Sequence, residues 1–253
     1  MSIESTVTAV VLAAGKGTRM KSELPKVAVV LNGSPLLLHV LKNLESANIK
    51  RKVVVIGYRK DVVTDIASSF PGVEFADQTE QLGTGHAVIC AESNIKNSDK
   101  YLIVACGDAP LISSHSFQSL LALHVEKGYS ATVLSAKMDD PTGYGRIIRS
   151  ADDGSLLRIV EQKDATAEEK VVNEVNTGTY CFTTEHLFDA LKNIGNDNAQ
   201  KEYYLTDVIK IFRNSGKKVG AMILLNALES HGINSPEDLE TAKQYIEKGL
   251  VGV

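Results

Sequence analysis

The stretch VVLAAGKGTRMKSELPK, residues 10–26, joins a buried strand to a basic loop that contains two glycines. The apolar run at residues 10–12 ends at small residues, which is typical of a strand covered on both faces. Gly15 and Gly17 allow the main chain to adopt positive φ and let N–H groups approach a ligand without a Cβ in the way. We therefore expect a loop here that can receive an anion.

Four cations surround this bend, namely Lys16, Arg19, Lys21 and Lys26. A glycine bend after a buried strand, ringed by cations, predicts a phosphate site. The alternative is an ordinary turn with a solvated basic surface. Two known phosphate loops are excluded, because Gly17 follows Lys16 where a P-loop needs Ser or Thr, and Met20 stands where a dinucleotide fingerprint needs its third glycine.

Composition narrows the class of partner. The chain has 253 residues and 43% hydrophobic content, which suffices for one large α/β domain or two small ones with a packed core. A net charge of -4 gives no general attraction to nucleic acid or to an anionic membrane. The basic loop is therefore a local feature, and its ligand should be a small anion.

The cysteines and the N-terminus predict a soluble, cytoplasmic protein. Cys90, Cys106 and Cys181 are widely spaced in apolar surroundings, which suits reduced thiols and gives neither a disulfide nor a zinc site. The first ten residues lack the basic and apolar regions of a signal peptide. No apolar run approaches the length needed to span a bilayer.

Strand-like and helical patterns alternate in the first half of the chain. Helical periodicity covers residues 36–47, 60–70, 85–93 and 116–128, and apolar strand-like runs cover residues 52–58, 73–76 and 101–106. This alternation predicts βαβ units on a mostly parallel sheet with helices on both faces. Ligands of such sheets bind beyond the carboxyl ends of the strands, where the glycine loop and Asp108 both fall.

The pattern changes after about residue 130. Strands are predicted at residues 130–138, 176–182 and 218–225, a hairpin region at 141–164, and helices at 184–194, 204–216 and 236–249. No linker, repeat or low-complexity segment interrupts the chain. We expect residues 1–253 to form a single compact domain.

Nine motifs occur in the order and spacing of a known family. They are LAAGKGTRM, LPK, QLGTGHAV, GDAPLI, DPTGYGRI, IVEQKDA, EVNTGTY, NAQKEYYLTD and HGIN. From about residue 7 to about residue 245 the chain resembles the uridyltransferase half of the bacterial bifunctional N-acetylglucosamine-1-phosphate uridyltransferase. The first motif is shared with many sugar-nucleotide and cytidylyl transferases, whereas QLGTGHA, PTGYGRI and NAQKEYY point to the uridyltransferase.

The resemblance implies an α/β, Rossmann-like nucleotidyltransferase of the glycosyltransferase A-like kind, with a nucleotide-binding half at about residues 1–130 and a sugar-binding half at about 131–253. It implies that UTP and N-acetylglucosamine 1-phosphate form UDP-N-acetylglucosamine and pyrophosphate by in-line attack on the α-phosphorus. The attacking phosphate is already ionised near pH 7, so alignment and charge neutralisation suffice without a protein nucleophile.

The same resemblance assigns site residues. Arg19 would bind the leaving pyrophosphate and Lys26 would bridge the nucleotide and sugar phosphates. The nucleotide would contact Leu12, Ala13, Ala14, Gly15, Gly17, Thr18, Gln78, Gly83 and Thr84, with the Gln78 amide reading the uracil imide edge. Gly83 and Thr84 can equally serve to cap the following helix, and His86 is interpreted as a packed helix residue.

The sugar would contact Gly145, Glu161, Asn176, Tyr203 and Thr206, although Glu161 can be a surface strand residue and Asn176 a turn former. In the family, Asp108 and Asn234 hold Mg²⁺, with substrate phosphate oxygens and waters completing its octahedron. The alternatives are a turn aspartate at Asp108 and a helix cap at Asn234.

Three departures from the family pattern limit the transfer, namely Cys106 in place of a tyrosine, Lys201 in place of a glycine, and Ala28-Val29 in place of a Leu-His. These departures touch the nucleotide and sugar margins, so another sugar 1-phosphate stays open as an alternative. A non-catalytic subunit that senses nucleotide sugars is an alternative from a different class, because the resembling fold also serves in regulatory roles. The sequence also lacks the hexapeptide repeats of the family's acetyltransferase half. We accordingly expect neither acetyl transfer nor the trimer that those repeats form.

Overall fold

A computed structural model describes residues 6–20 and 23–252. Within them the main sheet has nine strands, seven of which run in the order β11-β7-β10-β6-β1-β4-β5. These seven are β1 (Val7–Leu12), β4 (Arg51–Ile56), β5 (Val73–Asp77), β6 (Tyr101–Cys106), β7 (Ala131–Lys137), β10 (Glu174–Thr183) and β11 (Val219–Ile223). The hairpin β8 (Arg146–Arg149) and β9 (Leu156–Val160) pairs with β10.

The expected βαβ units form the first part of this sheet. Strands β5, β4, β1 and β6 are parallel, and β10 lies antiparallel between β6 and β7. Strand β1 is central, with Val10 facing Val53 on one side and Val104 on the other. This is the buried strand predicted from residues 10–12, although Leu12 at its carboxyl end is only half-buried.

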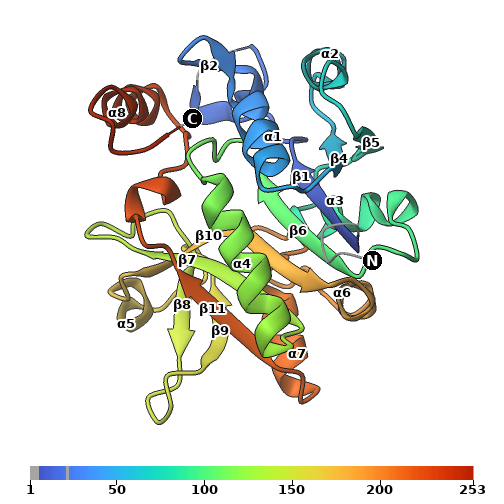
Figure 1. Cartoon of the computed structure of the whole chain (residues 1–253). Helices are drawn as coiled ribbons and strands as arrows, with labels where there is room; N and C mark the ends of the chain where they lie inside the picture. The colour runs from blue at the N-terminus through green and yellow to red at the C-terminus, as the bar shows by residue number, and fades with distance from the viewer. Residues whose placement is uncertain (1–5, 21–22, 253) are drawn as a thin grey trace.

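Helices cover both faces of the sheet (Figure 1). One face packs against α1 (Leu36–Ser46), α2 (Lys60–Ser68) and α4 (Ser114–Lys127). The other packs against α3 (Thr84–Cys90), α6 (Thr184–Leu191) and α7 (Asp207–Asn214). Successive β1 residues alternate between the two cores, since Ala9 and Val11 belong to the first and Val10 belongs to the second.

A third apolar cluster joins the segment after β1 to the C-terminal segment that contains the last described helix. The last helix, α8 (Pro236–Glu247), packs beside the two-stranded ribbon β2 (Val30–Leu31) and β3 (Ser34–Pro35). Met20 and Ile233 are both buried in this cluster. Each directly adjoins a predicted site residue, Arg19 and Asn234 respectively, so apolar packing brings these two side chains to one place.

Most predicted elements are present, with shifted ends. The helix expected at residues 204–216 begins only at Asp207, because the preceding segment is pinned to the loop before α3 by the bonds from the Tyr203 amide to the Leu82 carbonyl and from the Leu205 amide to the Thr84 hydroxyl. The sequence did not predict β2, β3 or α5 (Ala167–Lys170), each of which is four residues long or shorter.

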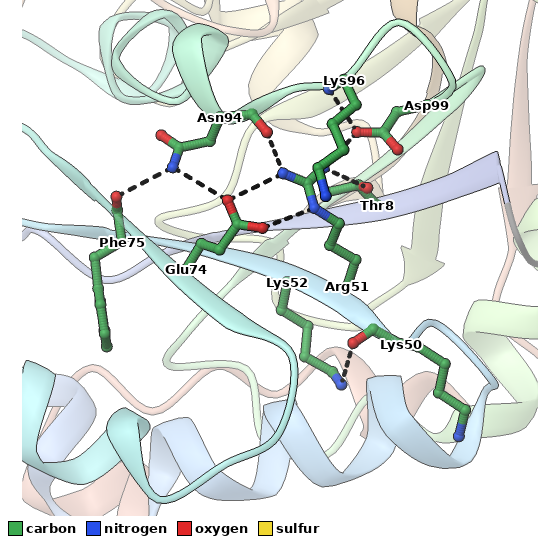
Figure 2. Close-up of polar contacts among 9 residues, drawn as sticks. All are labelled: Thr8, Lys50, Arg51, Lys52, Glu74, Phe75, Asn94, Lys96 and Asp99. Carbon is green, nitrogen blue, oxygen red and sulfur yellow. Dashed lines mark hydrogen bonds and ion pairs between the residues drawn. The ribbon is translucent and has the colours of Figure 1, made fainter.

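At the amino ends of the strands, Arg51 ties three segments together (Figure 2). Its guanidinium donates two parallel hydrogen bonds to Glu74, at 2.8 and 3.0 Å, and pairs with the buried Asp99 at 2.5 Å. It also donates to the Asn94 carbonyl. This cluster joins β4, β5 and the connection into β6 at the edge of the sheet opposite the predicted site.

Candidate active site

The direction in which successive strands are added to the sheet reverses at β1. Strands β4 and β5 lie on one side of β1, and the next strand in sequence, β6, lies on the other side. Ligands of open α/β sheets bind at such a switch point, beyond the carboxyl ends of the strands. The loop after β1 and the Gly107-Asp108 turn after β6 meet here, because the Gly107 amide donates to the Leu12 carbonyl at 2.9 Å. A Cβ at Gly107 would lie 3.1 Å from that carbonyl, so the close approach favours glycine.

The two loop glycines play different roles. Gly17 has φ +67°, and a Cβ there would lie 2.4 Å from the Lys26 Cβ, so only glycine lets Lys26 pack against the loop. The expectation of positive φ at Gly15 is wrong, since Gly15 is not among the positive-φ glycines. A Cβ at Gly15 would meet open space instead. The amides of residues 15–17 bond to no main-chain group of the described residues, so no such bond competes with a ligand for them.

A cavity of about 290 Å³ opens over this loop. Eight of the nine predicted nucleotide residues line it, together with Lys26, Asp108, Cys106, Gln81 and Glu202; the eight are Leu12, Ala13, Ala14, Gly15, Gly17, Gln78, Gly83 and Thr84. The ninth, Thr18, begins a short 3-10 turn at Thr18–Met20, and only its main chain is described. Lys21, the fourth cation of the sequence pattern, lies outside the described residues.

Gln78 is buried in the wall of this cavity, and its hydrogen bonds fix how its amide is turned. Its Nε2 donates to the Gly83 carbonyl and to His86 Nδ1, both at 3.1 Å. The two N–H donors are thereby used, and Oε1 is left to accept a hydrogen bond from a ligand. His86 is a helix residue of α3, as expected, and the structure adds that it holds Gln78.

The glycines of the GTG turn pack against the segment before α7. Gly83 has φ +113°, and a Cβ there would lie 2.7 Å from the Tyr203 carbonyl. The Gly85 amide donates to the same carbonyl at 2.8 Å, and the Thr84 hydroxyl accepts from the Leu205 amide at 3.1 Å. These residues therefore begin α3 and also anchor a segment from the other half of the chain.

The predicted metal ligands come together with the two predicted catalytic cations. The Lys26 ammonium forms an ion pair with the Asp108 carboxylate and donates to Asn234 Oδ1 at 2.8 Å. The Arg19 guanidinium donates to the same Asn234 oxygen at 2.8 Å. Asp108 and Asn234 thus point their oxygens at one position, although they are far apart in sequence.

Asp238, which sequence reasoning missed, holds the Asn234 loop. Its Oδ2 accepts from the Asn234 amide at 2.8 Å and from the Ser235 amide at 2.9 Å. Ser235 in turn caps α8 by accepting from the Asp238 amide at 3.2 Å. The sequence SPED at residues 235–238 is typical of a capping box with proline at the first helical position. This pattern was the sequence signal that could have identified Asp238. Asn234 is therefore not the cap residue itself.

A second cavity, of about 340 Å³, adjoins the first across Cys106 and Asp108, which line both. Arg19, Asn234 and Asp238 line it, together with three predicted sugar residues, Gly145, Glu161 and Asn176. The residues predicted to bind the sugar and those predicted to bind phosphate therefore face one continuous region. Burial raises the pKa of the Cys106 thiol to about 12, and the nearby Asp108 carboxylate adds to the effect, so this thiol is neutral at pH 7 and no nucleophile.

The polar sugar-side residues are held by internal hydrogen bonds. The Asn176 amide donates to the Tyr180 hydroxyl at 2.7 Å and accepts from the Gly178 amide at 3.0 Å, so Asn176 also forms a turn at a β-bulge. Glu161 accepts from the Thr206 hydroxyl at 3.2 Å. Burial nevertheless raises the pKa of Glu161 above its ordinary range.

Thr206 and Tyr203 line neither of these two cavities. Thr206 lines a third cavity of about 250 Å³ with Glu161, where it supports that carboxylate. The side chain of Tyr203 packs against the apolar core beneath α3 and α6 and lines none of these three cavities. A sugar contact by Tyr203 stays a prediction.

A larger cavity, of about 890 Å³, lies at the opposite edge of the sheet. Its lining includes Asp99 of the Arg51 cluster, Lys96, whose amide donates to Asp99, and the buried His124, whose pKa burial lowers to about 4. Its lining holds none of the predicted site residues, and its exposed charges, Lys96 and Lys100 against Glu92 and Glu185, balance. Size therefore does not identify the site here.

No helix among the described residues is long and apolar enough to cross a membrane.

The fold and the two-cavity site define a nucleotidyl transferase, and the chain belongs to the nucleotidyl transferase family, whose model matches residues 8–247. Among its relatives, the bifunctional protein GlmU of Streptococcus uberis is 48% identical over 242 residues, which cover 96% of this chain and 52% of that protein. GlmU of Streptococcus agalactiae is 49% identical over 238 residues, covering 94% and 51%. The chain thus spans about half the length of these relatives.

A solved structure confirms the predicted fold class. UDP-glucose pyrophosphorylase, determined in complex with UDP-glucose, shares the fold with a TM-score of 0.76 over 96% of this chain and 98% of that one, at 18% sequence identity. Nucleotidyl transferases of this family typically use a divalent metal ion.

Proposed function

We propose that this chain is a UTP:N-acetylglucosamine-1-phosphate uridylyltransferase that forms UDP-N-acetylglucosamine and pyrophosphate. The observation that carries the proposal is the convergence of Arg19, Lys26, Asp108 and Asn234 at the junction of the two cavities. The near 50% identity to bifunctional GlmU proteins supports the choice of substrates. In this account, residues of about 1–130 bind the nucleotide and those of about 131–253 bind the sugar.

The base is read in the first cavity. Both N–H donors of Gln78 are used internally, so Oε1 is the polar atom of this side chain that is left for the base. Because Oε1 can only accept a hydrogen bond, the base must supply a donor. Uracil offers an imide N–H, whereas the corresponding cytosine nitrogen is an acceptor and would leave Oε1 unpaired. This arrangement favours UTP over CTP.

The phosphates lie over the loop after β1. The main-chain amides of residues 15–17 bind phosphate oxygens, Arg19 neutralises the leaving pyrophosphate, and Lys26 bridges the nucleotide and sugar phosphates. Asp108 and Asn234 would hold Mg²⁺, which when bound supplies charge neutralisation at the phosphate oxygens. Their oxygens fit such an ion, because one positively charged atom, Lys26 Nζ, already contacts both.

The sugar 1-phosphate enters from the second cavity, so that its phosphate meets the α-phosphorus at the junction by Asp108. A phosphate monoester has a second pKa of roughly 6 and is ionised at pH 7, so no protein base is required. The neutral Cys106 thiol beside the junction is consistent with direct attack by substrate. Glu161 and Asn176 lie where hydroxyl and N-acetyl groups would be bound.

A pyrophosphate-release assay tests the proposal, with UTP, CTP, ATP and dTTP each offered with N-acetylglucosamine, glucose and galactosamine-type 1-phosphates. The expected outcome is turnover that is highest with UTP and N-acetylglucosamine 1-phosphate. A preference for another sugar 1-phosphate would correct the substrate only. Absence of turnover with every pair would favour the sensing subunit.

The three free thiols, Cys90, Cys106 and Cys181, are consistent with a reducing cytoplasm.

A further inference from the structure

Two cations contact the oxygens that are proposed to hold the metal ion. Lys26 pairs with the Asp108 carboxylate, and both Lys26 and Arg19 donate to Asn234 Oδ1 at 2.8 Å. The Lys26 and Asp108 side chains are only 15% and 23% exposed, so solvent screens this pair weakly. The oxygens of the two proposed metal ligands are thus occupied by the protein's own positive charges.

These contacts make the binding of a free metal ion electrostatically unfavourable. Among the groups in direct contact, two cations face one carboxylate and one neutral amide, a formal excess of one positive charge. The neighbouring Asp238 carboxylate is occupied by the amides of Asn234 and Ser235. A divalent ion entering alone would have to displace Lys26 and remain beside it, and like charges at such distances repel strongly.

A nucleoside triphosphate removes this obstacle. It carries several negative charges and binds over the same loop, so its phosphates offer Arg19 and Lys26 alternative partners. Once both cations move to phosphate oxygens, the Asp108 carboxylate and Asn234 Oδ1 are released toward a metal ion.

We infer that Asp108 and Asn234 accept the divalent ion only together with the nucleoside triphosphate, and that Lys26 and Arg19 exclude the free ion. The inference rests on the proposed function, because it takes these two residues as the metal ligands. The coupling is reciprocal: metal must raise nucleotide affinity by the factor by which nucleotide raises metal affinity, and such factors are commonly ~5- to 150-fold.

The test measures Mn²⁺ binding without any substrate. Binding is detected as the loss of the free Mn²⁺ signal in electron paramagnetic resonance. Lys26→Met keeps the aliphatic stem and removes the charge, so it should bind Mn²⁺ at least roughly tenfold more tightly than the unmodified protein. Lys16→Met is the matched control. It removes the same charge from the same loop, but Lys16 lies over the Tyr58 ring and contacts neither proposed ligand. It should leave Mn²⁺ affinity within about twofold.

A second variant protects the test against misfolding of the first. Arg19 is exposed, so Arg19→Met should fold and should also tighten Mn²⁺ binding, by less than Lys26→Met since Arg19 contacts Asn234 but not Asp108. Thermal melting confirms that each variant is folded. If neither variant binds Mn²⁺ more tightly than the unmodified protein, cation exclusion is overturned.

Adding Asp108→Asn to the Lys26→Met variant tests whether the gained Mn²⁺ binds at the proposed ligands, while pyrophosphate release by the unmodified protein tests the proposed function separately. The double variant should lose the gained Mn²⁺ affinity. If the gain persists without the Asp108 carboxylate, the metal ion binds elsewhere and the site assignment fails together with the inference.

Discussion

Asp108 stands at the junction of the two cavities, where its carboxylate is the only formal negative charge in direct contact with Arg19 or Lys26 among the described residues. Asp108→Asn keeps the size and hydrogen-bonding capacity of the side chain and removes this charge. We expect turnover to fall by about 10²-fold or more and the Mg²⁺ concentration for half-maximal rate to rise, since the group acts electrostatically. Steady-state kinetics across a Mg²⁺ series measures both. An unchanged metal requirement would show that Asp108 is not a ligand.

Gln78 gives a second prediction for a single residue. Gln78→Met keeps the length of the side chain but removes Oε1, the acceptor left for the imide N–H. The KM for UTP should rise and the preference for UTP over CTP should fall by roughly tenfold or more, since a hydrogen-bonding site loses its discrimination with the bond. Competition between the two nucleotides gives the ratio. A preference that survives would place base selection in another group.

At this scale the sequence predicts the positive φ of Gly17, which the close packing of Lys26 requires, but not the conformation of Gly15. It predicts poorly how side chains are turned. The commitment of both Gln78 donors depends on the Gly83 carbonyl and His86, which meet only in the folded chain. The same holds for Asp238, whose bond to the Asn234 amide is visible only once α8 is placed.

The first turn of helix α8 links helix capping to the proposed metal site. Asp238→Ala removes the acceptor of the Asn234 and Ser235 amides, so the Asn234 oxygen is no longer held in position. We expect a higher Mg²⁺ requirement and a loss of about 1 kcal/mol in stability, the usual effect of losing a helix cap.

Ser235→Ala is the matched control for this element. It removes the other half of the same capping box and should cost a similar ~1 kcal/mol, but it leaves the bond from the Asn234 amide to Asp238 intact. The Mg²⁺ requirement should therefore rise more in Asp238→Ala than in Ser235→Ala. Equal requirements at equal stability would assign Asp238 a purely structural role.

Element boundaries show where sequence periodicity stops being sufficient. Helix α4 begins at Ser114 and ends before Gly128, close to the predicted 116–128, because its serine cap and its glycine with φ +60° are local signals. The start of α7 at Asp207 is set instead by bonds to the distant Leu82 and Thr84. Periodicity alone cannot show such a constraint.

Across the whole molecule, the Arg51 cluster closes the edge of the sheet opposite the site (Figure 2). Arg51→Met would leave the buried Asp99 without its cation, and breaking a buried pair in this way typically costs about 3–5 kcal/mol. Urea unfolding at pH 7 measures this loss. Lys192→Met, which removes an exposed partner of Asp189, should change stability by less than about 0.5 kcal/mol.

The same cluster predicts a pH dependence. Hydrogen bonding to Arg51 holds the pKa of Glu74 below its ordinary value. A lowered folded-state pKa gives stability that is present above the unfolded-state pKa and lost as pH falls through the folded-state value. The stability gap between the unmodified protein and Arg51→Met should therefore narrow as the pH falls below about 4.5. A gap that stays constant down to pH 3 would contradict a contribution from the Glu74 pair.

The bond between Arg19 and Asn234 joins residues 215 positions apart, and this separation has a consequence for synthesis in the cell. At typical translation rates of ~5–20 residues per second, Asn234 follows Arg19 from the ribosome by roughly 10 to 40 seconds. During that interval β1, β4, β5 and β6 can already pair, and the basic loop after β1 is exposed without its distant partner. A nascent chain thus exposes the proposed phosphate-binding loop well before it has both proposed metal ligands, and the proposed site is complete only once Asn234 has emerged.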